Sequence, residues 1–364
     1  MTSIPADNES QNNRPPEEFL LSSLADTSVM QGLEDGQFSD ADNLERVAGF
    51  SVGIASLYVQ EALGYPFIVI RRQCQVNHGA LRYHIVPFTL FNVIAKINKR
   101  QTVSVFWKGW GSSCIVKGVA IITEIGICET LHIKRKGPSI KAEVLQKLLK
   151  GVTLLLTMPL ISASLVDTIQ THALGQTRTM LTFFKDAFDR VAGRYVSRGF
   201  GRLLPLSTLI VPSSMYGVLR YSIHALLSTI ITKVLSNRKN QFDDDRKQLW
   251  MRQSYYNELV SSLLSSFFTD VLLFPLETIV MRLHVQGTRT IIDDLDKGFG
   301  VTPLCTNYDG VTDCAITIHR EEGYGGFFKG FGALVLQYVV QTVIIKIAKS
   351  IYFSLPVGKN QKNM

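Results

Sequence analysis

Charged side chains stand close to prolines inside apolar stretches of this chain. Arg71 follows Pro66 by five residues, and Glu277 follows Pro275 by two. A buried charge needs a partner of opposite sign, because leaving water alone is costly. A proline inside a helix removes a backbone hydrogen bond and bends the helix. These spacings therefore predict kinked helices that carry charges in need of a partner.

The sequence holds no set of residues typical of catalysis. Its seven histidines are scattered, and no serine or cysteine nucleophile has a base nearby in the sequence. The five cysteines form neither a CxxC pair nor a zinc-type spacing with histidine. We therefore expect no enzymatic activity, no cofactor and no metal. The basic excess is spread through apolar segments, which also argues against a nucleic-acid partner.

The composition favours a bundle of membrane-spanning helices. Hydrophobic residues make up 46% of the chain and charged residues 19%. The long apolar segments carry interruptions, such as Pro159 and Asp167 within residues 151–171. Bundles of several spans tolerate such residues, because polar groups can face one another or a wet interior.

A proline recurs within an apolar segment at Pro66, Pro159 and Pro275. After each proline come a polar stretch, a short amphipathic segment and a second apolar segment. The predicted helices are 47–76, 86–99 and 105–131, then 145–172, 180–193 and 203–235, then 256–286, 311–321 and 331–355. Since about 20 apolar residues cross a bilayer, three such repeats predict six transmembrane helices. The predicted fold class is an all-α membrane protein with short connecting helices.

Charge is divided unevenly along the chain. Residues 1–45 contain ten acids and one arginine, so the remainder is strongly basic at a total charge of +8. The composition of this segment predicts disorder, and its acidity argues against a mitochondrial presequence. The predicted boundaries are an acidic N-terminal tail (1–45), a first repeat (46–136), a second (137–245), a third (246–356) and a C-terminal tail (357–364).

A second motif follows the short segments. In the third repeat it comprises Glu322-Gly323 and, a few residues later, Phe328-Lys329-Gly330. The first repeat keeps Phe106 to Gly109, including Lys108, but has Gln101-Thr102 where the acid and glycine belong. In the second repeat the motif is unrecognisable.

The stretch from Pro275 to Gly330 resembles the third repeat of the mitochondrial carrier family, and the other two repeats are worn copies. In that family, each first helix carries an acid two residues after the proline and a base five residues after it. The resemblance implies that the acid of one repeat pairs with the base of the next, closing the pore on one side.

Four of these six gate charges are missing here. Ile68, Ile161, Ser164 and Val280 stand at the vacant positions. Arg71 and Glu277 remain, and the order of the ring makes them partners. Tyr216 and Arg220 have the spacing of the family's opposite gate, but Gly217 replaces its acid. We expect one gate to keep a single ion pair and the other none.

The Lys-Gly pairs have two interpretations. The resemblance implies that Lys108 with Gly109, and Lys329 with Gly330, hold phospholipid headgroups, and anionic membrane lipids are expected partners. Free N–H groups at a helix start together with a lysine charge suit a phosphate. Alternatively, the glycines serve only close packing of helices.

Four segments narrow the resemblance to a divergent branch of the family in the mitochondrial outer membrane. They are Arg71–Asn77, Ser162–Leu165, Arg202–Leu206 and Leu283–Thr290. The resemblance implies roles in mitochondrial fission and fusion, cristae organisation and lipid homeostasis, with mitofusin-type fusion GTPases and the cristae-organising complex as partners. The loss of gate charges favours a non-transporting adaptor. A solute carrier with unusual gates, and a protein that binds or transfers lipid, remain alternatives.

Overall fold

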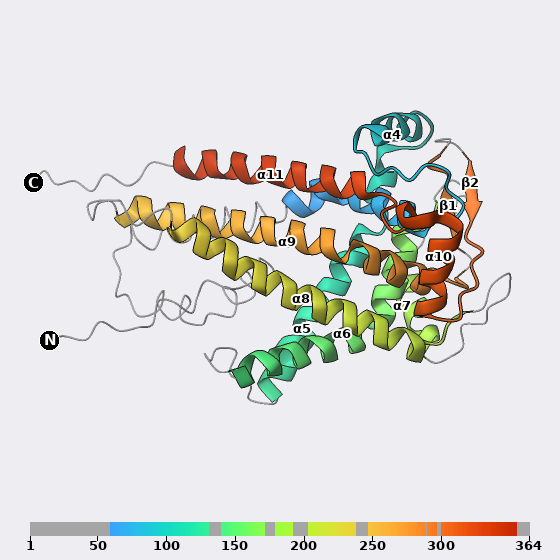
Figure 1. Cartoon of the computed structure of the whole chain (residues 1–364), viewed down its shortest axis with the longest axis horizontal. Helices are drawn as coiled ribbons and strands as arrows, with labels where there is room; N and C mark the ends of the chain where they lie inside the picture. Colours follow the sequence, from blue (N-terminus) through green and yellow to red (C-terminus); the bar gives the residue numbers. More distant parts are fainter. Residues whose placement is uncertain are drawn as a thin grey trace, which may run out of the picture. The chain divides into compact units, whose positions relative to one another are not determined.

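The computed structural model describes residues 59–130, 140–171, 179–191, 203–237, 247–288, 290–296 and 300–354. In this part of the chain the regular structure is helical apart from one two-stranded antiparallel sheet (Figure 1). In chain order the elements are a helix at residues 59–76, α4 (Phe88–Arg100), the 3-10 helix η1 (Val103–Trp107), α5 (Trp110–Thr130), α6 (Ile140–Ile169), α7 (Met180–Val191), α8 (Leu206–Asn237), α9 (Lys247–Val285), β1 (Ile291–Asp293), β2 (Val301–Pro303), α10 (Val311–Gly326) and α11 (Phe331–Ser354).

Each predicted repeat contains a long helix, a short helix and a second long helix. The short helices α4, α7 and α10 lie between the long ones in the chain order that the sequence predicts. Five helical stretches are long and apolar enough to cross a membrane: Val103–Thr130, Val144–Ile169, Leu206–Leu235, Leu259–Val285 and Phe331–Ile351. The helix at 59–76 carries Glu61, Arg71 and Arg72 and does not meet that criterion over its described residues. The mainly helical, membrane-type fold class is thereby confirmed, with five candidate spans among the described residues where the sequence predicts six.

All three repeat prolines lie inside helices. Pro66 is within the helix at 59–76, Pro159 within α6 and Pro275 within α9. A further proline, Pro212, lies inside α8 and has no place in the repeat pattern. The bend that each proline causes stays a prediction.

The chain divides into two compact units. One comprises Tyr65–Ser222 with Asp270–Gln337, and every site described below belongs to it. The other comprises the described parts of Met1–Gly64, Ile223–Thr269 and Tyr338–Met364, where Thr232 contacts Ser261 through their hydroxyl groups at 2.7 Å. Both predicted tails and the predicted repeat boundaries lie outside the described residues.

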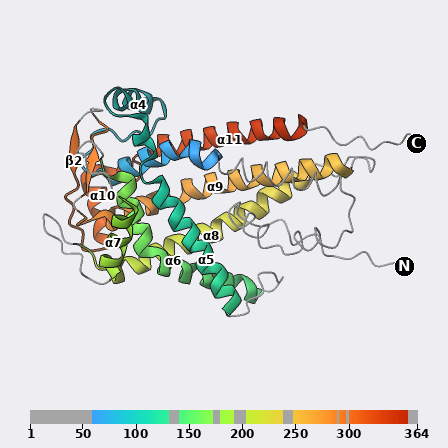
Figure 2. The same ribbon diagram turned by 180° about the vertical axis from the view of Figure 1, so that it is seen from behind.

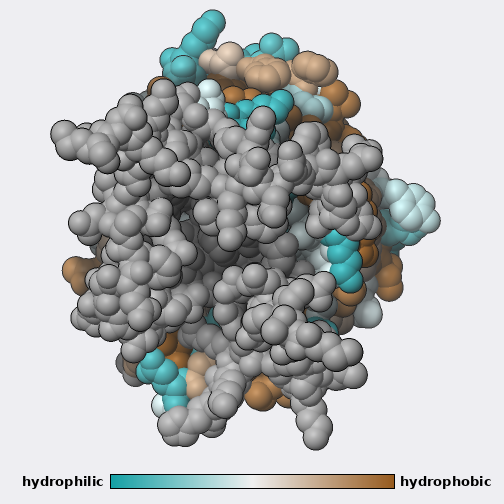
Figure 3. Space-filling model, turned by 90° about the vertical axis from the view of Figure 1, so that its left-hand side faces the viewer, coloured by the Kyte–Doolittle hydropathy of each residue, from teal (hydrophilic) through white to brown (hydrophobic). Residues whose placement is uncertain are grey.

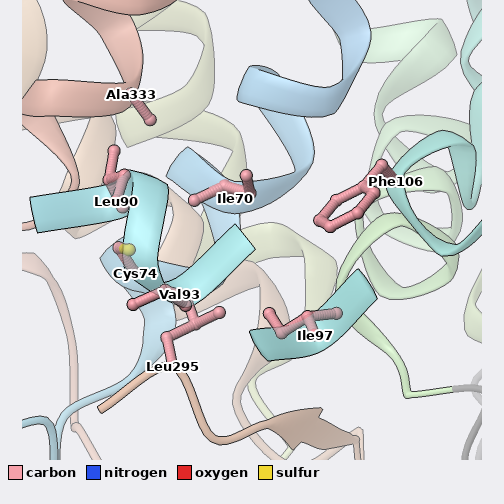
Figure 4. Close-up of a cluster of buried hydrophobic side chains, with 8 residues drawn as sticks. All are labelled: Ile70, Cys74, Leu90, Val93, Ile97, Phe106, Leu295 and Ala333. Carbon is pink, nitrogen blue, oxygen red and sulfur yellow. The ribbon is translucent and has the colours of Figure 1, made fainter. Parts of the chain in front are cut away.

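Within the first unit, the short helix α4 is held by an apolar cluster. Three residues on one face of α4 pack against residues of the preceding helix, η1, the segment after β1 and the start of α11 (Figure 4). The cluster consists of Ile70, Cys74, Leu90, Val93, Ile97, Phe106, Leu295 and Ala333. Fully burying an aliphatic side chain of this kind stabilises a fold by about 1.5–3 kcal/mol.

Many hydrophobic side chains remain on the surface of the long helices. Ile122 of α5, Leu156 of α6 and Val211 of α8 are each more than half exposed. In Figure 3, brown hydrophobic residues lie on the coloured, described part of the visible surface. Figure 2 shows α5 beside α6, a packing that joins the first and second repeats. Exposed apolar side chains on long helices suit a lipid environment.

We expect Gly330→Ala to destabilise the protein by about 1–3 kcal/mol. Gly330 has a φ of +83°, and an added Cβ would lie 2.7 Å from the Cβ of Cys74. Gly118→Ala in α5 is the control, because nothing lies within 4 Å of its added Cβ. Thermal unfolding in detergent measures both variants. Equal midpoints for the two would contradict a packing role for Gly330.

Candidate functional site: charged clusters where the repeats meet

One buried charged cluster joins helices from all three repeats. The Arg71 Nη2 atom, from the helix at 59–76, lies 3.1 Å from Oε1 of Glu277 on α9. Its Nη1 lies 3.9 Å from Oδ2 of Asp270 on the same helix. Asp270 also accepts a hydrogen bond from Arg220 Nε of α8 at 3.2 Å, and Arg220 Nη2 lies 3.1 Å from it. The structure thus brings Arg71 and Glu277 together, and adds Asp270 and Arg220 to them.

This cluster balances its formal charges, with two guanidinium groups and two carboxylates. The side chains of Arg71, Glu277 and Asp270 are at most 9% exposed, whereas that of Arg220 is 51% exposed. Pairing offsets the desolvation of each buried ion. Sequence reasoning found the Arg71–Glu277 pair from the order of the repeats. It did not connect Asp270 or Arg220 with this pair, because Asp270 lies outside the gate positions and Arg220 has the spacing of the opposite gate.

Uncharged side chains occupy the vacant gate positions. Ser164 and Val280 are buried, and Ser164 Oγ accepts a hydrogen bond of 3.3 Å from Ser112 Oγ of α5. Ile68 and Ile161 are half-buried. Since none of these side chains ionises, the corresponding ion pairs of the family cannot form here.

His284 occupies a second buried polar site, in the last turn of α9. Its Nδ1 lies 2.6 Å from Ser162 Oγ of α6, and its Nε2 lies 2.7 Å from Ser213 Oγ of α8. Arg190 of α7 donates through Nη1 and Nη2 to the His284 carbonyl, at 3.1 Å each. The imidazole therefore links two helices of the second repeat to the third. This arrangement is a structural hydrogen-bond bridge, because no carboxylate is among these partners.

In the third repeat, Glu322 holds two cations. Arg282 Nη1 and Nη2 donate to its two carboxylate oxygens at 2.6 and 2.8 Å. Lys329 Nζ lies 2.7 Å from Glu322 Oε2, donates to the carbonyls of Asn77 and His78, and lies 4.9 Å from the centre of the Tyr83 ring. Lys329 thereby ties the third repeat to the loop that follows the first helix of the first repeat.

In the first repeat, the corresponding lysine meets a carboxylate that the sequence analysis did not single out. Lys108 Nζ donates to Asp293 Oδ2 at 2.8 Å and to the Ile169 carbonyl at 3.3 Å. Asp293 is the last residue of β1, in the loop region between α9 and α10. One sequence signal could have led to Asp293. The first repeat keeps the motif lysine, Lys108, but has Gln101 where the motif acid belongs, so Lys108 needs a carboxylate from elsewhere.

The lysines of the two Lys-Gly pairs are both buried, and the phospholipid headgroups that the resemblance implies for them stay a prediction. The Lys108 side chain is 0% exposed and that of Lys329 is 1% exposed, and each faces a carboxylate. The structure favours the alternative interpretation of the glycines. Gly109 has a φ of +72°, and an added Cβ would lie 2.7 Å from the backbone nitrogen of Thr168. The glycines allow helices to approach closely.

Opposing effects act on the Asp293 carboxyl. Burial raises its pKa, but the Lys108 ammonium and hydrogen bonds from Lys108, Thr171 and Gln73 lower it, and the net pKa falls below the ordinary value of 3.8. A lowered carboxyl pKa stabilises the folded state above the unfolded pKa. That contribution is lost as the pH falls through the folded pKa. At neutral pH the Asp293 carboxyl is therefore ionised.

Among the described residues, no group of three or more His, Cys, Asp or Glu side chains is arranged to hold a metal ion. The clusters consist instead of paired charges and hydrogen-bonded hydroxyl groups. Such an arrangement can join helices, and it can oppose their separation.

A double-mutant cycle measures the coupling between Arg71 and Glu277. We expect Arg71→Gln to cost about 3–5 kcal/mol of unfolding free energy, because the buried Glu277 loses its cation and Asp270 keeps only Arg220. Glu277→Gln should cost less, since Asp270 still faces Arg71. The double variant should cost less than the sum of the single variants.

The control for this cycle is Arg320→Gln. Arg320 pairs with Glu321 at 3.8 Å, but the two side chains are 73% and 57% exposed. Such a pair contributes about 0–1 kcal/mol. Additive costs for Arg71 and Glu277, measured by chemical unfolding in detergent, would show that their proximity carries no coupling.

Comparison with known proteins identifies the family. The mitochondrial carrier protein family model matches residues 42–135 and 252–352. The chain is 41% identical to the mitochondrial outer membrane protein SLC25A46 of Gallus gallus, over 86% of this chain and 78% of that protein. It is 40% identical to the protein of the same name in Homo sapiens, over 88% and 78%, and in Danio rerio, over 86% and 80%. These names confirm the predicted outer-membrane branch and location. The chain belongs to the mitochondrial carrier family.

Proposed function

We propose that this chain is a non-transporting, carrier-like adaptor of the mitochondrial outer membrane. In this role it regulates mitochondrial fission and fusion, cristae organisation and lipid homeostasis. The membrane and the family follow from the relatives, whereas these finer roles rest on the resemblance and on the state of the gates. Its partners in the proposal are membrane lipids, mitofusin-type fusion GTPases and the cristae-organising complex.

The observation that carries the proposal is the composition of the buried charged cluster. Alternating access requires two gates that form and break in turn, with the two states balanced within a few kcal/mol. One gate here keeps the Arg71–Glu277 pair alone, and Arg220 of the opposite gate contacts Asp270. A residue from the second gate thus contributes to the same cluster as the first. An arrangement of this kind supports a fixed scaffold more readily than a pair of alternating gates.

Hydrogen bonds between polar side chains join the second repeat to the third, outside the vacant gate positions. The bridge from Ser162 through His284 to Ser213 joins α6, α9 and α8. Ion pairs can exchange partners between two states of similar energy, but a buried imidazole that loses both hydroxyl partners is left unsatisfied. The second repeat is therefore better suited to staying in place than to moving against its neighbours.

The exposed surface of α7 supports contact with lipid. Leu181 and Phe188 are 82% and 62% exposed, while Phe183 and Ala187 on another face are buried. A short helix that packs one apolar face against the protein and exposes a second apolar face fits the interface of a membrane. This feature agrees with the proposed role in lipid homeostasis.

The alternative is a solute or lipid transporter of the carrier family. The specific observation in its favour is Arg220, whose side chain is 51% exposed while its guanidinium contacts Asp270. A half-exposed arginine inside a carrier fold could attract an anionic solute. The complete motif of the third repeat points in the same direction.

Reconstitution into liposomes tests the proposal. Purified protein should show no saturable uptake of labelled carboxylates, nucleotides, phosphate or amino acids above protein-free vesicles. Saturable uptake that disappears in an Arg220→Gln variant would establish the transporter instead. Arg320→Gln is the matched control, since its arginine is exposed and its pair is weak.

A cellular assay tests the adaptor role directly. In cells depleted of their own related protein, the wild-type chain should restore a normal mitochondrial network. A double variant, Arg71→Met with Glu277→Gln, removes the remaining gate pair without leaving either charge alone. An adaptor should retain at least half of its rescue activity in this variant. Complete loss of rescue at equal protein abundance would contradict the proposal, because a scaffold does not need the gate pair.

A further inference from the structure

The first and third repeats contain the same set of positions around their motif lysines. Gln101 precedes Lys108 by seven residues, as Glu322 precedes Lys329. Gln73 follows Pro66 by seven residues, as Arg282 follows Pro275. In the third repeat, Arg282, Glu322 and Lys329 form a closed ion cluster. In the first repeat, two of the three positions are neutral glutamines, and only the lysine keeps its charge.

The carboxylate that the first repeat lacks comes from the third repeat. Gln73 Nε2 donates to Asp293 Oδ2 at 3.0 Å, Gln101 Nε2 donates to Asp293 Oδ1 at 3.3 Å, and Lys108 donates to Oδ2 at 2.8 Å. Asp293 thus contacts all three side chains of the set. Gln101 is a neutral amide and cannot provide a negative charge for Lys108. The Asp293 carboxylate provides that charge instead.

The second repeat is bound at the same point. Thr171 Oγ1 donates to Asp293 Oδ1 at 2.6 Å, and the Thr171 backbone N–H donates to the Ile291 carbonyl at 2.8 Å. Gln73 and Lys108 both donate to the Ile169 carbonyl at the end of α6. One carboxylate of the third repeat therefore meets polar groups of the first and second repeats.

An apolar cluster beside this carboxylate is also drawn from the three repeats. Its members are Val76, Leu165, Ile169, Val285, Ile292 and Leu304. Ile292 precedes Asp293 in β1 and is 0% exposed. The β1–β2 hairpin is therefore anchored on both faces, by Ile292 on one side and by Asp293 on the other, as expected for alternating residues of a strand.

We propose that Asp293 replaces the missing acid of the first repeat and acts as a latch that holds the three repeats together beside the β1–β2 hairpin. Opening this side of the carrier fold would require Lys108 to leave its carboxylate, at the cost of two separated buried charges. This inference rests on the proposed function in one point. A latch that stays closed fits a scaffold, whereas a transporter would have to open it.

The variant Asp293→Asn tests the latch in the full-length protein. Asparagine keeps a hydrogen-bond acceptor but removes the charge facing Lys108. We expect the midpoint of thermal unfolding in detergent to fall by roughly 5–10 °C. Hydrogen exchange should accelerate about tenfold or more at the Thr171 and Leu304 amides, which donate to residues of the same region. Unchanged midpoint and exchange would overturn the proposal.

A charge relocation shows whether the effect comes from the missing acid. Combining Gln101→Glu with Asp293→Asn returns the carboxylate to the position that Glu322 holds in the third repeat. This double variant should recover at least half of the lost thermal midpoint. If the double variant is no more stable than Asp293→Asn alone, Asp293 is not the substitute for that acid.

Asp294→Asn is the matched control, because it removes the same charge from the adjacent residue. The Asp294 Oδ1 atom accepts from the Asp296 backbone N–H, and asparagine retains this acceptor. We expect its midpoint and exchange to stay near wild type. An equal loss in both variants would attribute the effect to general charge and overturn the latch.

These measurements are independent of transport. If Asp293→Asn behaves like wild type while liposomes show no uptake, the latch is wrong and the adaptor stands. The other outcome is that the wild-type protein transports a solute, while Asp293→Asn is destabilised and Gln101→Glu restores its stability. The adaptor proposal is then wrong, and Asp293 still replaces the missing acid but does not hold the repeats together permanently.

Discussion

A charge that leaves water requires a partner, and this requirement governs how the three repeats are joined. Arg71, Lys108 and Arg282 are buried, and each contacts a carboxylate on a different element. The partners come from α9, β1 and α10. The long helices expose apolar side chains to their surroundings, so contacts of this kind, with the apolar clusters between them, determine which helix lies beside which.

The repeats satisfy this constraint in different ways. The third repeat supplies both cations and carboxylate from its own residues, whereas the first takes its carboxylate from Asp293. The second repeat lacks gate charges and uses hydroxyl groups, as in the contact of Ser164 with Ser112. Hydrogen bonds between small polar side chains permit close approach without ionic desolvation. The three repeats have lost different motif charges, and each is joined to its neighbours by a different kind of polar contact.

The amino-acid sequence predicts the helices well, because proline spacing and apolar length are local properties. The family resemblance also predicts the Arg71–Glu277 contact, since the family's ring pairs the acid of the third repeat with the base of the first. The sequence does not predict the carboxylate partners of Lys108 and Lys329, because burial by neighbouring elements cannot be read from a Lys-Gly pair. Asp293 escapes prediction for a related reason: it lies in a strand that has no counterpart in the repeat pattern, and its partners are far away in the chain.

The distance between Lys108 and Asp293 has a consequence for the synthesis of the protein. The two residues are 185 positions apart. A ribosome makes the N-terminal part first, so the first repeat and its lysine are complete long before Asp293 has been added. During that interval Lys108 cannot reach its final dry environment with this counter-ion. The packing around Lys108 in the first repeat can therefore be completed only after the part of the third repeat that contains Asp293 has been made.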